Sequence, residues 1–139
     1  MVPMGLDGEK LLLQLNRLEE YLKSINELAK KKKSSVRRRA LERLVQIAVE
    51  ETLNIGNHLI SGKGWERPNN YREIFQVLEK EKVISKDLSE ELQHFAVFRN
   101  RIVHLYWKIS DEEFEQQLQR IHILIKFAKV VEKINAGNK

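Results

Sequence analysis

The chain has 139 residues, of which 42% are hydrophobic and 32% are charged, and these proportions are typical of one folded domain with a single core. It contains no cysteine, which excludes disulfide bonds, thiolate zinc sites and cysteine nucleophiles. The net charge of +5 weakly favours an anionic partner. Because no apolar run approaches the roughly 18 residues of a membrane span, and residues 1–8 lack the pattern of a secretory signal, we expect one cytoplasmic domain over residues 1–139 that does not enter a membrane.

The first predicted helix begins near Leu6, after a loose start at residues 1–5. Its apolar residues are spaced by three and four, which is the pattern of a helix that buries one narrow stripe in a bundle. These residues are Leu11, Leu15, Leu18, Leu22, Ile25 and Ala29. The stripe predicts core packing.

A basic segment, residues 30–39, follows this helix. Its cations are Lys30, Lys31, Lys32, Lys33, Arg37, Arg38 and Arg39. Like charges at this density repel one another and stay solvated, so a helix-ending loop is the simpler interpretation, with Ser34 or Ser35 capping the next helix. The alternative is a patch that contacts the phosphates of RNA.

The second predicted helix spans residues 36–60, and a short third helix spans residues 71–81. Gly56 lies inside the second helix at a cost of about 1 kcal/mol relative to alanine, which indicates that another helix approaches closely there. Glu50 and Asn54 interrupt the apolar face one turn apart. They lie either in a cleft beside a functional site or on plain surface.

The fourth predicted helix begins after Ser85 and carries the densest group of chemically active side chains. It contains Arg99, Asn100, His104 and Tyr106 within eight residues. Histidine exchanges protons near neutral pH, and arginine presents a fixed positive fork to phosphate. These groups can move a proton beside a phosphate without a metal ion, so the sequence predicts a functional site here.

A regular helix cannot aim these side chains at one point. At 100° per residue Arg99 and Tyr106 share a face, whereas His104 lies about 140° away from Arg99. Either the helix loosens after about Val103, or two copies of the chain bring their motifs together across a two-fold axis. C2 pairing is the commonest oligomer, and some loosening of the helix is also possible.

The fifth predicted helix begins at Ser110, with Glu113 reaching back to complete the cap. Its buried face is formed by Phe114, Leu118, Ile121, Ile125, Ala128 and Val131. The acids at its start diverge around the helix and have no histidine beside them, so we expect no metal ion. The other histidines have no metal-ligand spacing and are interpreted as surface or packing residues: His58, His94 and His122.

The motif Arg99-x4-His104-x-Tyr106, with Asn100 directly after the arginine, resembles the signature of the HEPN superfamily and of its HepT-like branch. The similarity extends over most of the chain, from about Leu6 to Ile134. This resemblance implies an all-α, antiparallel bundle of about five helices that forms a homodimer.

The resemblance also implies a function, that of an endoribonuclease toxin without a cofactor. His104 would act as general acid or base, Arg99 would hold the phosphate, and Asn100 would support them. The usual partner of such toxins is a minimal nucleotidyltransferase (MNT) antitoxin, which can transfer AMP groups to the motif tyrosine, here Tyr106. Toxin and antitoxin can assemble into a larger hetero-oligomer.

Two other interpretations remain open for the motif. One is a non-catalytic HEPN subunit that binds a nucleotide or RNA and partners the nucleotidyltransferase. The other is a structural dimer in which the polar groups of the motif only satisfy one another. The first of these differs from a nuclease in binding RNA without cutting it, and the second predicts a buried, fully paired His104.

Overall fold

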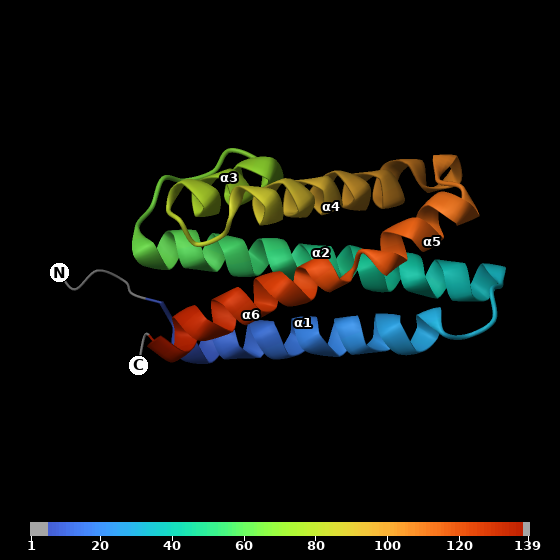
Figure 1. Cartoon of the computed structure of the whole chain (residues 1–139), viewed down its shortest axis with the longest axis horizontal. Coiled ribbons are helices and arrows are strands. Elements are labelled where there is room, and N and C mark those ends of the chain that lie inside the picture. The colour runs from blue at the N-terminus through green and yellow to red at the C-terminus, as the bar shows by residue number, and fades with distance from the viewer. Residues whose placement is uncertain (1–5, 138–139) are drawn as a thin grey trace.

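The computed structural model describes residues 6–137, and this part of the chain is helical without a strand (Figure 1). The elements are α1 (Gly8–Ala29), α2 (Ser35–Lys63), α3 (Tyr71–Lys80), α4 (Lys86–Leu105), the 3-10 helix η1 (Tyr106–Lys108), α5 (Asp111–Gln119) and α6 (His122–Gly137). The predicted all-α class is confirmed, while the predicted loose start lies outside the described residues. No helix within residues 6–137 is both long enough and apolar enough to cross a bilayer.

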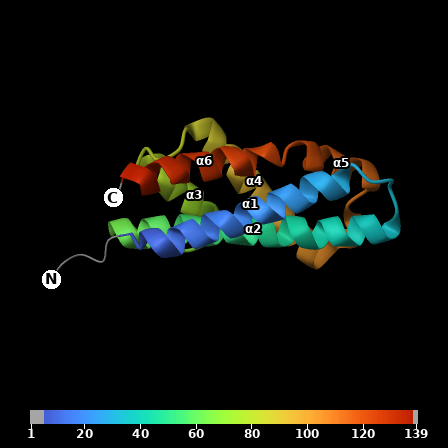
Figure 2. The same ribbon diagram turned by 90° about the horizontal axis from the view of Figure 1, so that it is seen from below.

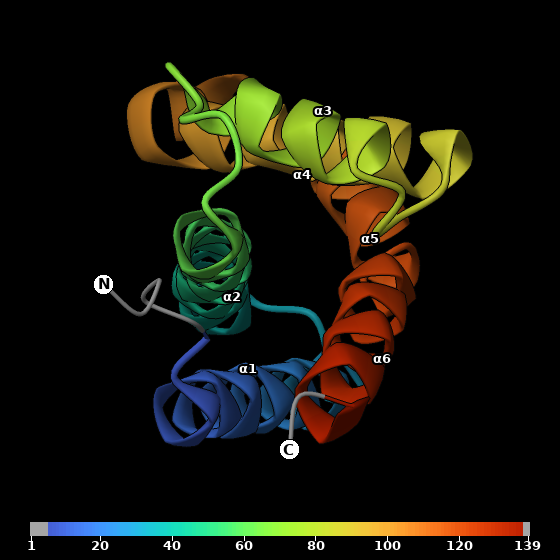
Figure 3. The ribbon, with the colours of Figure 1, turned by 90° about the vertical axis from the view of Figure 1, so that its left-hand side faces the viewer.

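Four long helices surround one core. Seen along the bundle, α1, α2, the layer of α3 and α4, and α6 follow one another around the centre (Figure 3). From below, α1 runs obliquely across α2 (Figure 2). The start of α1 lies beside the end of α6, where the Asn135 side chain donates a hydrogen bond of 3.3 Å to the carbonyl of Gly8. The largest fully buried side chains are Phe75, Phe95, Phe114 and Phe127.

Side-chain caps fix where the helices begin. In each case the side-chain oxygen accepts a hydrogen bond from the backbone N–H three residues later, which satisfies one of the free donors of the first turn. The capping residues at the starts of α2, α3, α4 and α5 are Ser34, Asn70, Ser85 and Ser110. Gly64, with a φ of 69°, ends α2 in the left-handed conformation that glycine adopts without strain.

The predicted fifth helix is divided into α5 and α6. The backbone turns at Arg120, whose φ and ψ angles are −95° and 2°, and the Ile121 N–H bonds to a carbonyl three residues earlier. Ile121 stays buried at the break, so the apolar periodicity continues through it. That continuity explains why the sequence predicts a single helix.

Gly56 lies where α2 meets α3, and the close approach predicted from its position is confirmed. A Cβ atom at Gly56 would lie 2.6 Å from Cγ2 of Ile74 and 3.6 Å from Cδ1 of Leu78. The absence of a side chain therefore lets α3 pack directly on α2. This packing places the start of α3, with Tyr71, beside the motif on α4.

Candidate functional site

Arg99 is held in one orientation between α2, α3 and its own helix. Its Nη2 and Nε donate to Oε2 of Glu50 at 2.6 and 3.0 Å, and its Nη1 donates to Oδ1 of Asn100 at 3.0 Å. The guanidinium carbon also lies 5.8 Å from the centre of the Tyr71 ring. With 17% of its side chain exposed, Arg99 is preorganised rather than free in solvent.

Glu50 contacts the motif through Arg99, so its carboxylate does not lie on plain surface. Partial burial raises the pKa of Glu50, but hydrogen bonds from Arg99 and Gln46 outweigh this effect and hold the pKa below its ordinary value. At neutral pH Glu50 is therefore a carboxylate that balances the charge of Arg99 within one chain. Asn54 instead donates a hydrogen bond of 3.4 Å to Glu51, so it does not join the motif.

His104 is exposed in the last turn of α4. The helix loosens, as one sequence interpretation proposed, but only from Leu105, where φ and ψ are −140° and 34°. Because this change follows His104, the angle between His104 and Arg99 around the helix is unaffected. Within the described part of the chain, no hydrogen bond or ion pair joins these two side chains. A single chain does not bring them together.

The outer surface of α4 and η1, called here the α4–η1 surface, presents apolar side chains to solvent. Its exposed large apolar residues are Val97, Val103, Leu105, Tyr106 and Trp107. Tyr106 and Trp107 are 54% and 65% exposed, and their rings pack edge to face with centres 5.4 Å apart. Exposed apolar side chains next to a polar motif favour an interaction surface.

The basic segment divides into buried and exposed cations. Arg37 is buried, and its guanidinium donates to both carboxylate oxygens of Glu115 at 3.0 Å and to the carbonyls of Leu28 and Ala29 at the end of α1. Its charge is therefore satisfied within the fold. The cations that face solvent are Lys30, Lys31, Lys32, Lys33 and Arg39.

Arg38 fastens η1 and the start of α5 to α2. Its Nη2 donates to the carbonyl of Ile109 at 2.8 Å, its Nη1 to Asp111 at 2.5 Å, and its Nε to Glu42 at 3.2 Å. The guanidinium also lies 4.7 Å from the centre of the Phe114 ring, in a cation–π contact. Arg38 thus brings the basic segment next to the turn that carries the motif tyrosine.

Over residues 11–134 the sequence matches the family described as Ribonuclease HepT-like. The chain belongs to this family. A stretch of 67 residues is 31% identical to the Bacillus subtilis (strain 168) protein named "Putative RNase YutE". This stretch covers 48% of the HepT-like chain and 46% of YutE, so the match spans less than half the length of that relative.

Solved structures share the fold of the HepT-like chain. The YutE structure, described as a cytosolic protein of unknown function from Bacillus subtilis, aligns with a TM-score of 0.78 at 25% identity over 93% of this chain and 90% of YutE. The tri-AMPylated HEPN toxin of Shewanella oneidensis, in complex with an MNT antitoxin, aligns with a TM-score of 0.83 at 19% identity. That alignment covers 88% of this chain and 96% of the toxin. The HEPN fold predicted from the motif is confirmed.

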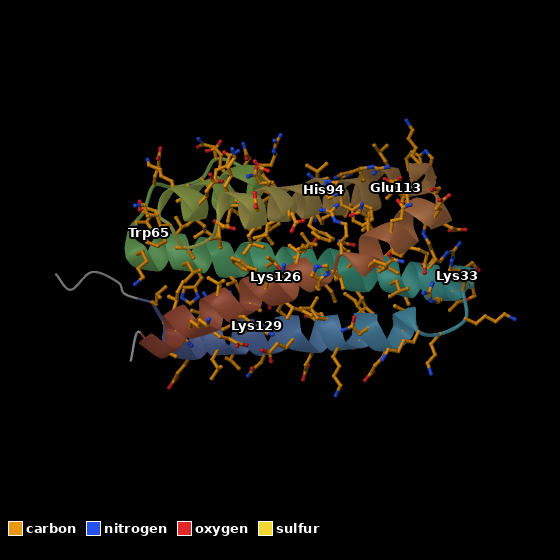
Figure 4. All side chains as sticks on the ribbon, in the orientation of Figure 1. Lys33, Trp65, His94, Glu113, Lys126 and Lys129 are labelled. Carbon is orange, nitrogen blue, oxygen red and sulfur yellow. The ribbon has the colours of Figure 1, made fainter. Side chains whose placement is uncertain are left out.

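One contact of the HepT-like site was not predicted from the sequence. Arg101, inside the motif, forms a two-bonded pair with Glu113 of α5, with Nη2 and Oε1 3.1 Å apart. The hydrogen bond from Arg101 lowers the pKa of Glu113 below its ordinary value. The expectation that Glu113 reaches back to its own cap is wrong, because its carboxylate is taken by Arg101. Figure 4 shows Glu113 near the end of α4.

The three remaining histidines have local contacts. Nδ1 of His58 lies 2.8 Å from Oε1 of Gln14, and burial lowers the pKa of His58 below its ordinary value. His94 and His122 are exposed. In residues 6–137 no three acidic or histidine side chains gather in the manner of a metal site.

Proposed function

We propose that this HepT-like protein is a metal-independent endoribonuclease, the toxin of a two-protein system in the cytoplasm. The observation that carries the proposal is that the chain of a ribonuclease family has the whole motif at the end of α4 and the start of η1, with Arg99 fixed by Glu50 and His104 open to solvent. The RNase name of YutE supports the same reaction class.

The proposed reaction uses a nucleophile that RNA itself supplies. His104 removes the proton of a 2′-hydroxyl, the 2′-oxygen attacks the neighbouring phosphorus, and the bond from phosphorus to the 5′-oxygen breaks as that oxygen takes up a proton. Arg99 binds the phosphate and stabilises the charge that grows on its oxygens, and Asn100 keeps Arg99 in place through the bond to Nη1. A general base of this kind typically contributes about 10²–10⁴-fold in rate.

The site requires two chains in this proposal. Arg99 and His104 diverge around one helix, so Arg99 of one chain meets His104 of a second chain across a two-fold axis. The exposed apolar residues of α4 itself, Val97, Val103 and Leu105, lie on the helix that carries both groups, and such pairing would cover them. The phosphate then competes with the Glu50 carboxylate for the Arg99 guanidinium.

Replacing His104 by alanine tests the catalytic role. We expect His104→Ala to lose RNA cleavage in the presence of a chelator while its circular dichroism spectrum and melting temperature stay those of the wild type, because the His104 side chain is exposed and forms no hydrogen bond or ion pair with residues 6–137. His122→Ala, another exposed histidine, is the matched control and should cut at the wild-type rate. An unchanged rate in His104→Ala would remove the proposal, and RNA binding without any cutting by the wild type would leave the non-catalytic HEPN subunit.

We further propose that an MNT antitoxin silences the protein by transferring AMP to Tyr106. The exposed phenol of Tyr106 can be reached by a partner enzyme, and a HEPN toxin of the same fold is tri-AMPylated in complex with its MNT antitoxin. The added phosphate and base bring negative charge and bulk beside the proposed RNA site, which repels a substrate phosphate. The two proteins together would form the hetero-oligomer.

Mass spectrometry tests this modification. The protein, co-expressed with a nucleotidyltransferase encoded beside it, should carry AMP on Tyr106 and cut RNA more slowly than the unmodified protein. Tyr106→Phe should carry no adduct and escape silencing. An intact mass without an adduct in the wild type, or silencing that persists in Tyr106→Phe, would contradict this part of the proposal.

A further inference from the structure

A groove of about 490 Å³ lies at one end of the bundle, where the start of α2 faces η1 and the start of α5. Its lining includes Lys33, Arg38, Arg39, Tyr106, Trp107 and Ile109. Neither Arg99 nor His104 lines it, so it is separate from the proposed catalytic groups. It nevertheless begins next to them, because Trp107 follows His104 by three residues.

The lining of this groove carries four cations and three carboxylates, so its net charge is slightly positive, and one of the carboxylates, that of Asp111, is 87% exposed. Its three carboxylates are held by the two inward-facing arginines: Glu115 pairs with Arg37, and Glu42 and Asp111 pair with Arg38. Lys33 and Arg39 are exposed, and within residues 6–137 neither forms an ion pair. Figure 4 shows Lys33 at this end of the bundle, far along the molecule from Lys129. The groove therefore offers two uncommitted cations to an anion.

The groove also offers an aromatic face. Trp107 is the most exposed aromatic side chain among the large apolar residues, at 65%, and the edge contact with Tyr106 holds it at the groove. Its position depends on Arg38, which fixes the carbonyl of Ile109 just after η1. An exposed indole beside unpaired cations is the combination with which proteins bind single strands, since bases stack on the ring and phosphates meet the cations.

We propose that this groove binds single-stranded RNA beside the cleavage site, with one base stacked on Trp107 and the adjoining phosphates on Lys33 and Arg39. This inference rests on the proposed function, because it names the substrate of that site. A double helix does not fit the same description, since its bases are stacked on each other and cannot turn onto the indole. An AMP group on Tyr106 would occupy the same groove, so bound RNA and the modification would exclude each other.

Binding measured without cleavage tests the groove. The His104→Ala protein is titrated with a fluorescently labelled single-stranded RNA and with a duplex of the same sequence. We expect clear preference for the single strand, and Trp107→Ala added to this background should weaken binding roughly tenfold, as loss of one stacked base does. Lys33→Gln with Arg39→Gln should flatten the salt dependence by about 1.4 in the log–log slope, which corresponds to two lost phosphate contacts.

The matched control keeps the charge change but moves it away from the groove. The control variant carries Lys23→Gln and Lys129→Gln, on the exposed faces of α1 and α6. Its salt-dependence slope should change by no more than roughly a third of the change in the Lys33/Arg39 variant, because non-specific attraction falls off beyond a Debye length of about 8–10 Å. Melting temperatures of all variants establish that each is folded.

The outcomes separate this inference from the proposed function. If the wild type cleaves RNA but Trp107→Ala and the Lys33/Arg39 variant bind RNA as before, the groove proposal is contradicted and the proposed nuclease activity is retained. Binding through the groove by a protein that never cuts RNA would support the groove and overturn the nuclease. Equal affinity for the duplex and the single strand would contradict the proposal that the groove binds unpaired bases.

Discussion

Arginine side chains have three different roles in this chain, and the roles differ even between arginines two positions apart. Arg37 is buried and closes the end of α1, Arg39 two positions later is exposed, and Arg99 is presented to the site by Glu50. In the sequence, the basic segment of residues 30–39 is only a group of seven cations close together. What each does is decided by the acids and carbonyls that other parts of the fold place against it.

Arg37 provides a prediction about stability. Replacing it by methionine should lower the free energy of unfolding by about 3 kcal/mol, because the Glu115 carboxylate and two carbonyls lose a buried partner. Arg39→Met, at an exposed position two residues on, should change it by no more than about 0.5 kcal/mol. Urea unfolding at pH 7 measures both, and equal effects of the two substitutions would contradict the structural role of Arg37.

The same pair predicts a dependence on pH. The hydrogen bond from Arg37 holds the pKa of Glu115 below its ordinary value, so the pair stabilises the fold fully above the unfolded pKa of about 4.3. That stabilisation is lost as the pH falls through the lower, folded pKa. The difference between wild type and Arg37→Met should therefore shrink below about pH 4. If the difference in unfolding free energy between the two proteins stayed constant below pH 4, the ion pair would contribute nothing to stability.

Among the elements, the joint between α2 and α3 decides how the motif is supported. Gly56→Ala should destabilise the protein by about 1–3 kcal/mol, because its Cβ atom would press on Ile74 at 2.6 Å and force α3 away from α2. That cost exceeds the gain of about 1 kcal/mol that alanine brings to an ordinary helix position. The same change at Gly137, where nothing lies within 4 Å, is the control.

Thermal unfolding of Gly56→Ala and Gly137→Ala checks this prediction. A displaced α3 would also move Tyr71 away from Arg99, so we expect Gly56→Ala to lose part of any cleavage activity. Gly137→Ala should retain both stability and activity. A stabilised Gly56→Ala would contradict the close packing of the two helices.

Element starts could be predicted from the sequence, because a cap depends on residues three apart. Ser85 and Ser110 each bond to the N–H that the spacing predicts. The break between α5 and α6 could not be predicted, since Ile121 keeps the apolar period while the backbone turns. The expected bond from the Glu113 carboxylate back to the cap is absent for a similar reason, because the carboxylate is taken by Arg101 of another helix.

The candidate site was predictable in part. The divergence of Arg99 and His104 follows from helix geometry alone, and the structure retains it. From the sequence, Glu50 could lie either beside the motif or on plain surface. Its bond to Arg99 depends on how α2 and α4 pack, which the sequence does not show. The groove could not be predicted, because residues 33–39 and Trp107 are distant in the chain and meet only through Arg38.

At the scale of the whole molecule, the chain is one helical bundle with an unsatisfied face. The core is closed on itself, yet the α4–η1 surface leaves apolar side chains beside a charged motif open to water. A second chain laid on the α4 part of this surface across a two-fold axis would cover Val97, Val103 and Leu105 and place Arg99 of one copy toward His104 of the other. The proposed cleavage site depends on this pairing, since one chain alone keeps Arg99 and His104 apart.

Mixing two inactive variants measures that pairing directly. Arg99→Ala and His104→Ala chains, each inactive alone and each dimeric by size-exclusion chromatography, are unfolded together and refolded as a mixture. If the site forms between chains, half of the dimers are mixed and each has one intact site, so activity should return to about a quarter of the wild-type value. A mixture as inactive as its components would contradict a site shared between two chains.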